Sequence, residues 1–249
     1  MTVDGAWILV RIRPFVDRAL RRRHLSQLLA ASPEEATAAA AALLASAAAG
    51  SIDPQVAAAI GVLTLALGDL AYADRATLYR IALEQGAPAV ARLLLDASPP
   101  TLGADELDRR LRPDRPLRNR GRALTLGERK ALARRPRGDV LVELLRDPHP
   151  DVIRILLDNP QLTEREAVQI AASRPAVPAA LALVAAHPRW STRAIVRRAL
   201  ALNPHTPVHL AIRLTVTLGP GDWIEVASSA DLASALRDHA RDLLAARRR

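Results

Sequence analysis

The spacing of apolar residues in the first hundred positions is that of helices. Apolar side chains recur every three or four residues, as at Leu78, Ile81 and Ala82, which places them on one face of a helix. Pro and Gly separate these segments, and Ser32-Pro33 and Asp53-Pro54 are typical of helix starts. The pattern predicts about five antiparallel helices with short connections, over residues 7–30, 32–49, 53–67, 74–86 and 88–95.

The second half of the chain has the same periodicity and clearer helix boundaries. Thr163 and Glu166 have the spacing of a capping box, which begins a helix. Pro150 fits a first helical turn, and Asn159-Pro160 ends that helix because proline lacks the N–H that the next hydrogen bond needs. Helices are predicted over residues 126–134, 139–146, 150–158, 163–173, 178–186 and 190–202, and one more follows Thr206-Pro207.

Residues 98–127 interrupt the helical pattern. Pro99, Pro100, Pro113 and Pro116 fall in this stretch together with glycines, which is typical of a linker or an extended surface crossing. The sequence therefore predicts three parts: an N-terminal antiparallel helical bundle over residues 1–97, a Pro- and Arg-rich linker over residues 98–127, and a repeat domain over residues 128–249.

Two nine-residue stretches that start 44 residues apart share a pattern. Residues 152–160 and 196–204 have Val, Arg, Leu, Asn and Pro at the same five positions. A fixed period of a few tens of residues is the signature of stacked helical repeats, in which each unit buries its apolar face against the next. The same offset reaches residues 240–245, where the pattern also matches well but the Asn-Pro is lost. One period therefore holds about three helices.

Two junctions in this region carry a resemblance to a known family. Asp147-Pro148-His149-Pro150-Asp151-Val152 and Asn203-Pro204-His205-Thr206-Pro207 resemble junctions of bacterial HEAT-like solenoids and of leucine-rich-repeat-variant proteins, over about residues 128–218. The resemblance implies an all-α fold, a right-handed α-solenoid of HEAT/armadillo-like helical repeats, which acts as a curved scaffold for another macromolecule. Some variant-repeat proteins hold a cysteine-bound iron–sulfur cluster, which does not transfer because this chain has no Cys.

Composition narrows the chemistry open to the chain. Half of its residues are apolar, many of them Ala, and aromatic residues make up 2%. Ala and Leu favour helices, and the alternating runs typical of strands are nearly absent. The lack of Cys excludes disulfides, thiolate catalysis and cysteine-bound metals. The longest uncharged stretch, residues 36–52, is a poor membrane span. We therefore expect a soluble cytoplasmic protein with no cofactor and no membrane partner.

Positive charge is concentrated in one segment. Residues 98–137 hold twelve Arg and Lys against five Asp and Glu, in a chain whose net charge is +9. Such a segment can neutralise phosphates, although an Arg bias of this strength also arises from a GC-rich genome. The candidate polyanion or partner surface comprises Arg109, Arg110, Arg112, Arg115, Arg118, Arg120 and Arg122, with Arg189, Arg193 and Arg197 as a second stripe at i, i+4 and i+8.

The remaining candidate residues have simple structural interpretations. His205 and His209 lie four apart, but the proline between them places the first before a helix, which argues against a shared metal. The acidic residues around His149 form a helix-start motif. Trp190 is a candidate interface aromatic, although core packing is the more frequent role of a tryptophan. Most carboxylates fall at helix starts, where they offset the helix dipole.

These observations favour a non-catalytic helical scaffold or adaptor that binds a protein partner. No spacing indicates a nucleophile elbow, a Ser–His–Asp group or a glycine phosphate loop, so an enzyme is not predicted. The alternative is a nucleic-acid-binding HEAT-like protein that uses the basic surface, although the shortage of aromatic residues argues against single-strand binding. A DNA glycosylase is a distant third hypothesis, because no spacing places its acidic group.

Overall fold

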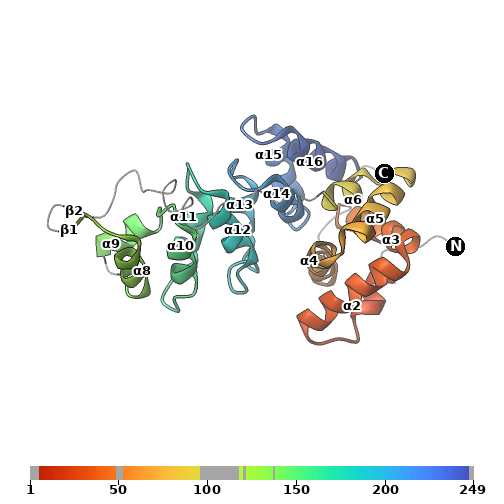
Figure 1. The fold of residues 1–249 in the computed structure, drawn as a ribbon. Coiled ribbons are helices and arrows are strands. Elements are labelled where there is room, and N and C mark those ends of the chain that lie inside the picture. The colour runs from red at the N-terminus through yellow and green to blue at the C-terminus, as the bar shows by residue number, and fades with distance from the viewer. Residues whose placement is uncertain (1–5, 49–52, 96–117, 120–121, 137, 247–249) are drawn as a thin grey trace. The chain divides into compact units, whose positions relative to one another are not determined.

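Helices make up 72% of the described chain in this computed structural model (Figure 1). The structure describes residues 6–48, 53–95, 118–119, 122–136 and 138–246, and these form fifteen helices and one two-stranded hairpin. The all-α prediction is confirmed. The chain divides into two compact units, of which unit 1 comprises residues 1–97 and 211–249 and unit 2 comprises residues 98–210.

Unit 1 is built around one alanine-rich helix. Its helices are α1 (Ala6–Ile12), α2 (Arg18–Ala31), α3 (Pro33–Ala48), α4 (Pro54–Asp69), α5 (Tyr72–Glu84), α6 (Pro88–Leu93), α15 (Pro220–Ser228) and α16 (Ser234–Ala246). The central α3 packs against α1, α2, α4, α5, α6 and α16. Its buried Ala36, Ala39 and Ala40 are small, so several helices can approach it closely.

Two helix boundaries in unit 1 differ from the prediction. The helix expected over residues 7–30 is two helices, because Pro14 lies between α1 and α2 and cannot continue a helical ladder. The helix expected to begin at Asp74 begins at Tyr72, and Asp74 lies in its first turn. Pro14 therefore separates two helices, and Asp74 lies in the first turn of α5 rather than at its N-cap.

Unit 2 is a run of short helices preceded by a hairpin. Its elements are β1 (Arg118–Asn119), β2 (Arg122–Ala123), α8 (Leu126–Arg134), α9 (Gly138–Leu144), α10 (Pro150–Leu157), α11 (Glu164–Ala172), α12 (Pro178–Ala186) and α13 (Ala194–Ala201), and α14 (Val208–Thr215) spans the boundary with unit 1. Helices two apart pack together, as α8 does with α10, α10 with α12, and α11 with α13. The hairpin falls in the predicted linker, most of which lies outside the described residues.

The two similar stretches, residues 152–160 and 196–204, have matching environments in the fold. In α10 the apolar Val152 and Leu156 are buried, and in α13 their counterparts Val196 and Leu200 are buried too. The Arg shared by the two stretches is exposed in both, at positions 154 and 198. The shared identities therefore mark the same inner and outer faces of two helices.

The asparagine of each copy joins its helix to another helix. The Asn159 Nδ2 donates to the Arg134 carbonyl at the end of α8, at 3.4 Å. The Asn203 Nδ2 donates to the carbonyls of Ala171 and Ser173 at the end of α11, at 2.8 and 2.9 Å. Each side-chain oxygen also accepts the backbone N–H two residues later. The same residue type thus makes the same kind of connection twice.

The predicted capping box of α11 is confirmed, and α8 has an equivalent one. Thr163 accepts the N–H of Glu166, and the Glu166 carboxylate accepts the N–H of Thr163. Thr125 and Glu128 make the same pair of bonds at the start of α8. These reciprocal bonds satisfy backbone donors that a helix leaves unpaired at its first turn.

Residues 211–249 pack within unit 1, whereas the sequence placed them at the end of the 128–249 repeat domain. The helix α16 packs against α3, α6 and α15 and buries Leu236, Ala240 and Leu243. The third match at the 44-residue offset, residues 240–245, falls in this helix. Its apolar face meets helices that are distant in sequence, which a local repeat pattern does not reveal.

The helices are too short or too polar to cross a bilayer. Among the described residues, none of them combines the length and the apolar character that a membrane span requires.

Candidate functional site

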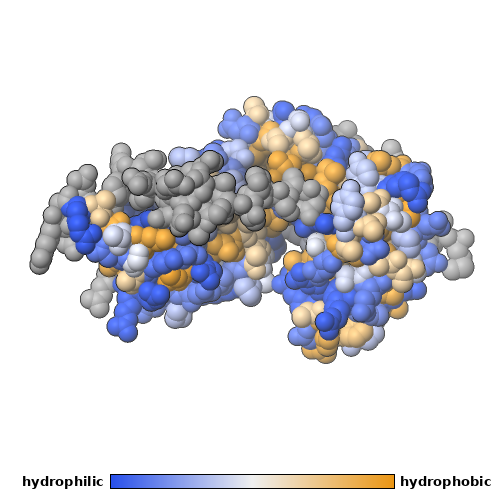
Figure 2. Space-filling view, in the orientation of Figure 1, coloured by the Kyte–Doolittle hydropathy of each residue, from blue (hydrophilic) through white to orange (hydrophobic). Residues whose placement is uncertain are grey.

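Unit 2 carries most of the positive charge of the chain. It holds twenty Arg and Lys against twelve Asp and Glu, a net charge of +8 out of the +9 of the whole chain. Figure 2 shows hydrophilic residues over much of its described surface, with apolar patches between them. A net positive surface attracts nucleic acids and acidic proteins through the same long-range electrostatics. What the surface can bind depends on which of these cations are available to a partner.

The Arg-rich segment that the sequence singled out is described only at its end. Arg109, Arg110, Arg112, Arg115 and Arg120 lie outside the described residues. Arg118 lies in β1, where it is the backbone partner of Ala123 in the hairpin. The proposed polyanion role of this segment stays a prediction.

Arg122 forms a local ion pair at the start of α8. Its guanidinium donates to both carboxylate oxygens of Glu128, at 2.9 and 2.6 Å. The bonds from Arg122, followed by those from Thr125, lower the pKa of Glu128 to about 2. The pair is exposed, so it contributes little to stability.

Arg189 and Trp190 hold the turn after α12 against the end of α10. The Trp190 side chain is only 1% exposed, and its Nε1 donates to the Leu157 carbonyl at 3.0 Å. The Arg189 guanidinium lies 4.2 Å from the centre of the Trp190 ring and donates to the Pro160 carbonyl at 3.3 Å. The prediction of Trp190 as an interface aromatic is therefore corrected: it is a core residue, buried because it closes the end of α10.

The predicted stripe of Arg189, Arg193 and Arg197 does not form on one helix. The helix α13 begins at Ala194, so Arg189 lies in the preceding turn and Arg193 is the exposed N-cap residue. Arg197 folds back and donates to two carbonyls of that turn, at 3.2 and 2.8 Å. The i, i+4, i+8 spacing assumed a helix from residue 190, and the turn that buries Trp190 takes up the first of these positions.

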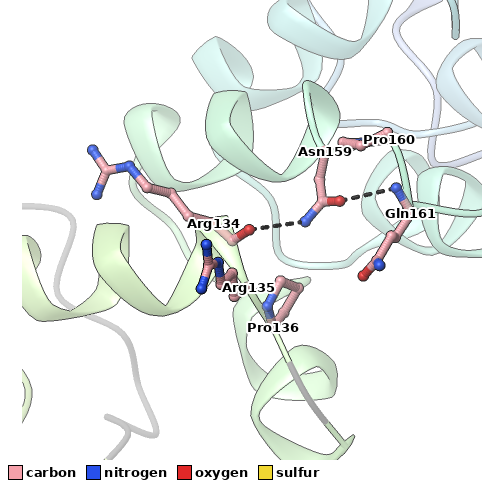
Figure 3. Close-up of a pocket in the computed structure, with 6 residues that line it drawn as sticks. All are labelled: Arg134, Arg135, Pro136, Asn159, Pro160 and Gln161. Atoms are coloured by element: carbon pink, nitrogen blue, oxygen red, sulfur yellow. Dashed lines mark hydrogen bonds between the residues drawn. The ribbon is translucent and has the colours of Figure 1, made fainter.

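An open pocket of about 480 Å³ lies where the ends of α8 and α10 meet (Figure 3). Its lining consists of Arg134, Arg135, Pro136, Asn159, Pro160 and Gln161. The Asn159 amide faces the Arg134 carbonyl, and the Arg134 guanidinium points away from Asn159 (Figure 3). These six residues include no carboxylate and no imidazole.

The acidic residues around His149 connect α8 to α10. Asp147 forms an ion pair with Arg129 in which the side chains are 3% and 6% exposed, and it accepts the N–H of His149 at 2.9 Å. The His149 Nδ1 accepts the N–H of Asp151 at 3.1 Å, as the N-cap of α10. Lys130 pairs with Asp151 and lowers the pKa of that carboxyl. The prediction of a helix-start motif is confirmed.

Metal binding finds no support in the part of the chain that the structure describes. No group of three or more His, Asp or Glu side chains there could hold a metal ion. His205 lies exposed before α14 and His209 lies within it, in the arrangement that the intervening proline predicts.

Sequence reasoning missed two buried polar features. The first is the ion pair of Arg129 with Asp147, whose partners lie 18 positions apart. The second is His239 of α16, whose two ring nitrogens are buried without a hydrogen-bond partner. Its position between the buried Leu236 and Leu243 was the available signal, because that spacing puts a histidine on an apolar helix face.

Comparisons with known proteins give no relative from which a function could be transferred. The chain matches no family model, no curated protein and no solved structure. The resemblance to HEAT-like and leucine-rich-repeat-variant solenoids therefore stays a prediction, and a function has to be inferred from the geometry of the chain itself.

Proposed function

We propose that this protein is a non-catalytic helical-repeat scaffold that binds another protein. The shared role of Asn159 and Asn203 carries the proposal. Each amide joins its helix to the helix two positions earlier, α10 to α8 and α13 to α11. Stacked repeats require side chains that hold one helix to the next in successive copies. Unit 2 in this proposal is a short HEAT-like solenoid.

The ionisable side chains of unit 2 support a scaffold rather than an enzyme. Catalytic sites gather groups with perturbed pKa values in a cleft. The two carboxyls of unit 2 whose pKa values are lowered among the described residues, Glu128 and Asp151, lie in the first turns of α8 and α10 and pair with cations. Their carboxylates cap and connect helices.

Capture from the native host tests the scaffold function. The full chain, carrying an affinity tag, is captured from cell extract at low and at high salt, and bound protein and nucleic acid are both quantified. We expect a protein in stoichiometric amount that stays bound at high salt, because apolar contacts resist screening. Recovery of nucleic acid alone, which dissociates at high salt, contradicts the proposal.

The net charge of +8 on unit 2 favours a second candidate function, the binding of nucleic acid. Arg134, Arg135 and Arg193 add exposed cations to those of the Arg-rich segment. Each phosphate that such cations neutralise releases bound counterions, so affinity falls steeply as salt rises.

Titration of a random DNA duplex at several salt concentrations tests this second function. Replacing Arg115, Arg118, Arg120 and Arg122 with Gln is expected to lower the affinity for DNA. The slope of log affinity against log salt concentration should also become smaller by about one for each phosphate that the variant no longer neutralises. Unchanged affinity in this variant excludes the Arg-rich segment as a nucleic-acid site.

A further inference from the structure

The helix α5 in unit 1 has an exposed apolar stripe along its outer face. Tyr72, Tyr79 and Leu83 are 82%, 37% and 55% exposed, and Ala76 between them is exposed as well. Their spacing of four, three and four residues places all four side chains along one line of the helix. The stripe extends along nearly the whole helix, from its first residue to its last turn.

This outer face is separate from the face that holds α5 in unit 1. Leu78, Ile81 and Ala82 are buried and face the packing partners α3 and α6. The tyrosines are also the only two in the chain. Tyrosine is enriched at protein interfaces because its ring gives a large contact area with little loss of side-chain entropy. Both tyrosines therefore lie on the exposed face of α5 and not among its buried residues.

The stripe has the heptad spacing of a coiled-coil seam. Tyr72 and Tyr79 take d positions, and Ala76 and Leu83 take a positions. In this register the exposed Arg80 takes the e position, whereas the g position of the same heptad is the buried Ala82, so the open flank of the seam carries an arginine. The pair of Arg80 with Glu84 is exposed on both sides, at 64% and 59%, and such pairs give way to better partners.

We propose that α5 is a docking site for an amphipathic helix of another protein, with an apolar a/d seam and acidic residues at its e and g positions. The inference rests on the proposed scaffold function and names where and how the partner binds. An acidic flank would face Arg80, and the apolar seam would cover Tyr72, Tyr79 and Leu83.

The two arginines of α5, Arg75 at a g position and Arg80 at an e position, make a second copy of this helix a poor partner. In a parallel pair, the g position of one helix faces the e position of the other, so Arg75 would meet Arg80 of the copy. In an antiparallel pair, each arginine would meet its own counterpart. Like charges in these positions select against self-pairing.

Tyrosine-selective iodination gives a direct test, because both tyrosines of the chain lie in the stripe. The probe is a designed three-heptad peptide with Leu at a and d and Glu at e and g, which is too acidic to pair with itself. Its control is a scrambled peptide of the same composition. We expect the probe, and not the scrambled peptide, to slow labelling of Tyr72 and Tyr79 at least fivefold.

Binding of the labelled probe to variants of the full chain separates a specific seam from general charge attraction. Leu83→Glu and Arg80→Glu are each expected to weaken binding at least tenfold. The matched control is Arg193→Glu, which removes an exposed cation from unit 2 and is expected to leave affinity within twofold. Circular dichroism and thermal unfolding confirm that each variant is folded.

Three results would each overturn the proposal for α5. They are an equal loss of probe affinity in Arg193→Glu, binding of the scrambled peptide, and binding of the probe that does not slow labelling of the tyrosines. A dimer of the chain that Leu83→Glu dissociates also overturns it, because the occupant is then a second copy. If a captured native protein binds the Leu83→Glu variant as well as the parent, the scaffold function stands and α5 is not its site. If capture yields no protein, the scaffold function itself fails.

Discussion

His239 shows how one buried side chain makes the stability of unit 1 depend on pH. It is 0% exposed in α16, and neither ring nitrogen has a hydrogen-bond partner. Burial, and secondarily the nearby charge of Arg92, lowers its pKa to about 3. Arg92 is itself paired with Asp242 one turn further along α16. The imidazole is therefore neutral in the folded protein at pH values where an unfolded chain would protonate it.

We predict that the free energy of unfolding falls as the pH falls from about 6.5 towards 3. In this window the unfolded state binds a proton at His239 and the folded state does not, so stability is full above pH 6.5 and declines by up to about 1.4 kcal/mol per pH unit below it. His239→Leu should remove this part of the pH dependence. Urea unfolding at pH 7, 6, 5 and 4 measures it.

The exposed His205 provides the matched control for that measurement. His205→Leu should leave the slope of stability against pH as it is in the parent chain, because that side chain lies at the surface and not in the core. An equal slope in the parent and in His239→Leu would contradict the assigned role of His239.

We predict that Asn203→Ala destabilises the protein more than Asn159→Ala does. Asn203 is 1% exposed and donates to two carbonyls, whereas Asn159 is 8% exposed and donates to one carbonyl at 3.4 Å. Loss of Asn203 leaves buried acceptors unpaired, at a cost of roughly 2–3 kcal/mol, against roughly 1 kcal/mol for Asn159. Thermal or urea unfolding of both variants checks the order, and the reverse order would refute it.

At the residue scale, the sequence predicted local roles better than long-range ones. The capping box of Thr163 and the helix start at His149 follow from neighbours within three residues. Arg189 and Arg197 were placed on a surface stripe, but both donate to backbone carbonyls of nearby turns. The bend that brings those carbonyls within reach is set by the burial of Trp190, which local spacing does not specify.

At the scale of elements, periodicity located the helices and missed the interruptions. The helices α8, α10, α11 and α12 agree with prediction to within one or two residues. The break between α1 and α2, the late start of α13 and the hairpin were not predicted. A proline or a buried tryptophan shifts a boundary by a few residues without changing the apolar pattern on either side.

We predict that the two faces of α5 respond differently to substitution. Leu78→Ala should cost roughly 2–5 kcal/mol, because its side chain is 2% exposed and its loss leaves a cavity. Leu83→Ser should change stability by about 0.5 kcal/mol or less, since that side chain is 55% exposed. Urea unfolding of the two variants measures the difference. A large cost for Leu83→Ser would mean that the outer face serves the fold, and would remove the basis for docking there.

At the scale of the whole molecule, the sequence indicated a helical protein but not which helices belong together. The C-terminal α16 was assigned to the repeat domain, and it packs against α3 and α6 of unit 1. Contacts between the two ends of a chain depend on three-dimensional packing, which hydrophobic periodicity does not encode. The charge asymmetry was visible in the sequence, since unit 2 holds a net +8.

We predict that truncation after residue 233, which removes α16, loosens unit 1 selectively. The truncation exposes surfaces of α3 and α6 that now pack against Leu236, Ala240 and Leu243. Hydrogen–deuterium exchange should therefore rise in α3 and α6, while α10 and α12 of unit 2 serve as the internal control and keep their protection. Faster exchange in α10 and α12 of the same size would contradict the division into two units.

Photo-crosslinking in the native host tests the central claim, that the chain is a protein-binding scaffold, most directly. A photoreactive amino acid replaces Tyr79 on α5 or, in a second variant, Arg193 on unit 2. We predict one defined protein adduct from position 79 and no such adduct from position 193. Nucleic-acid adducts at position 193 with no protein adduct at position 79 would contradict the account and favour the nucleic-acid-binding alternative.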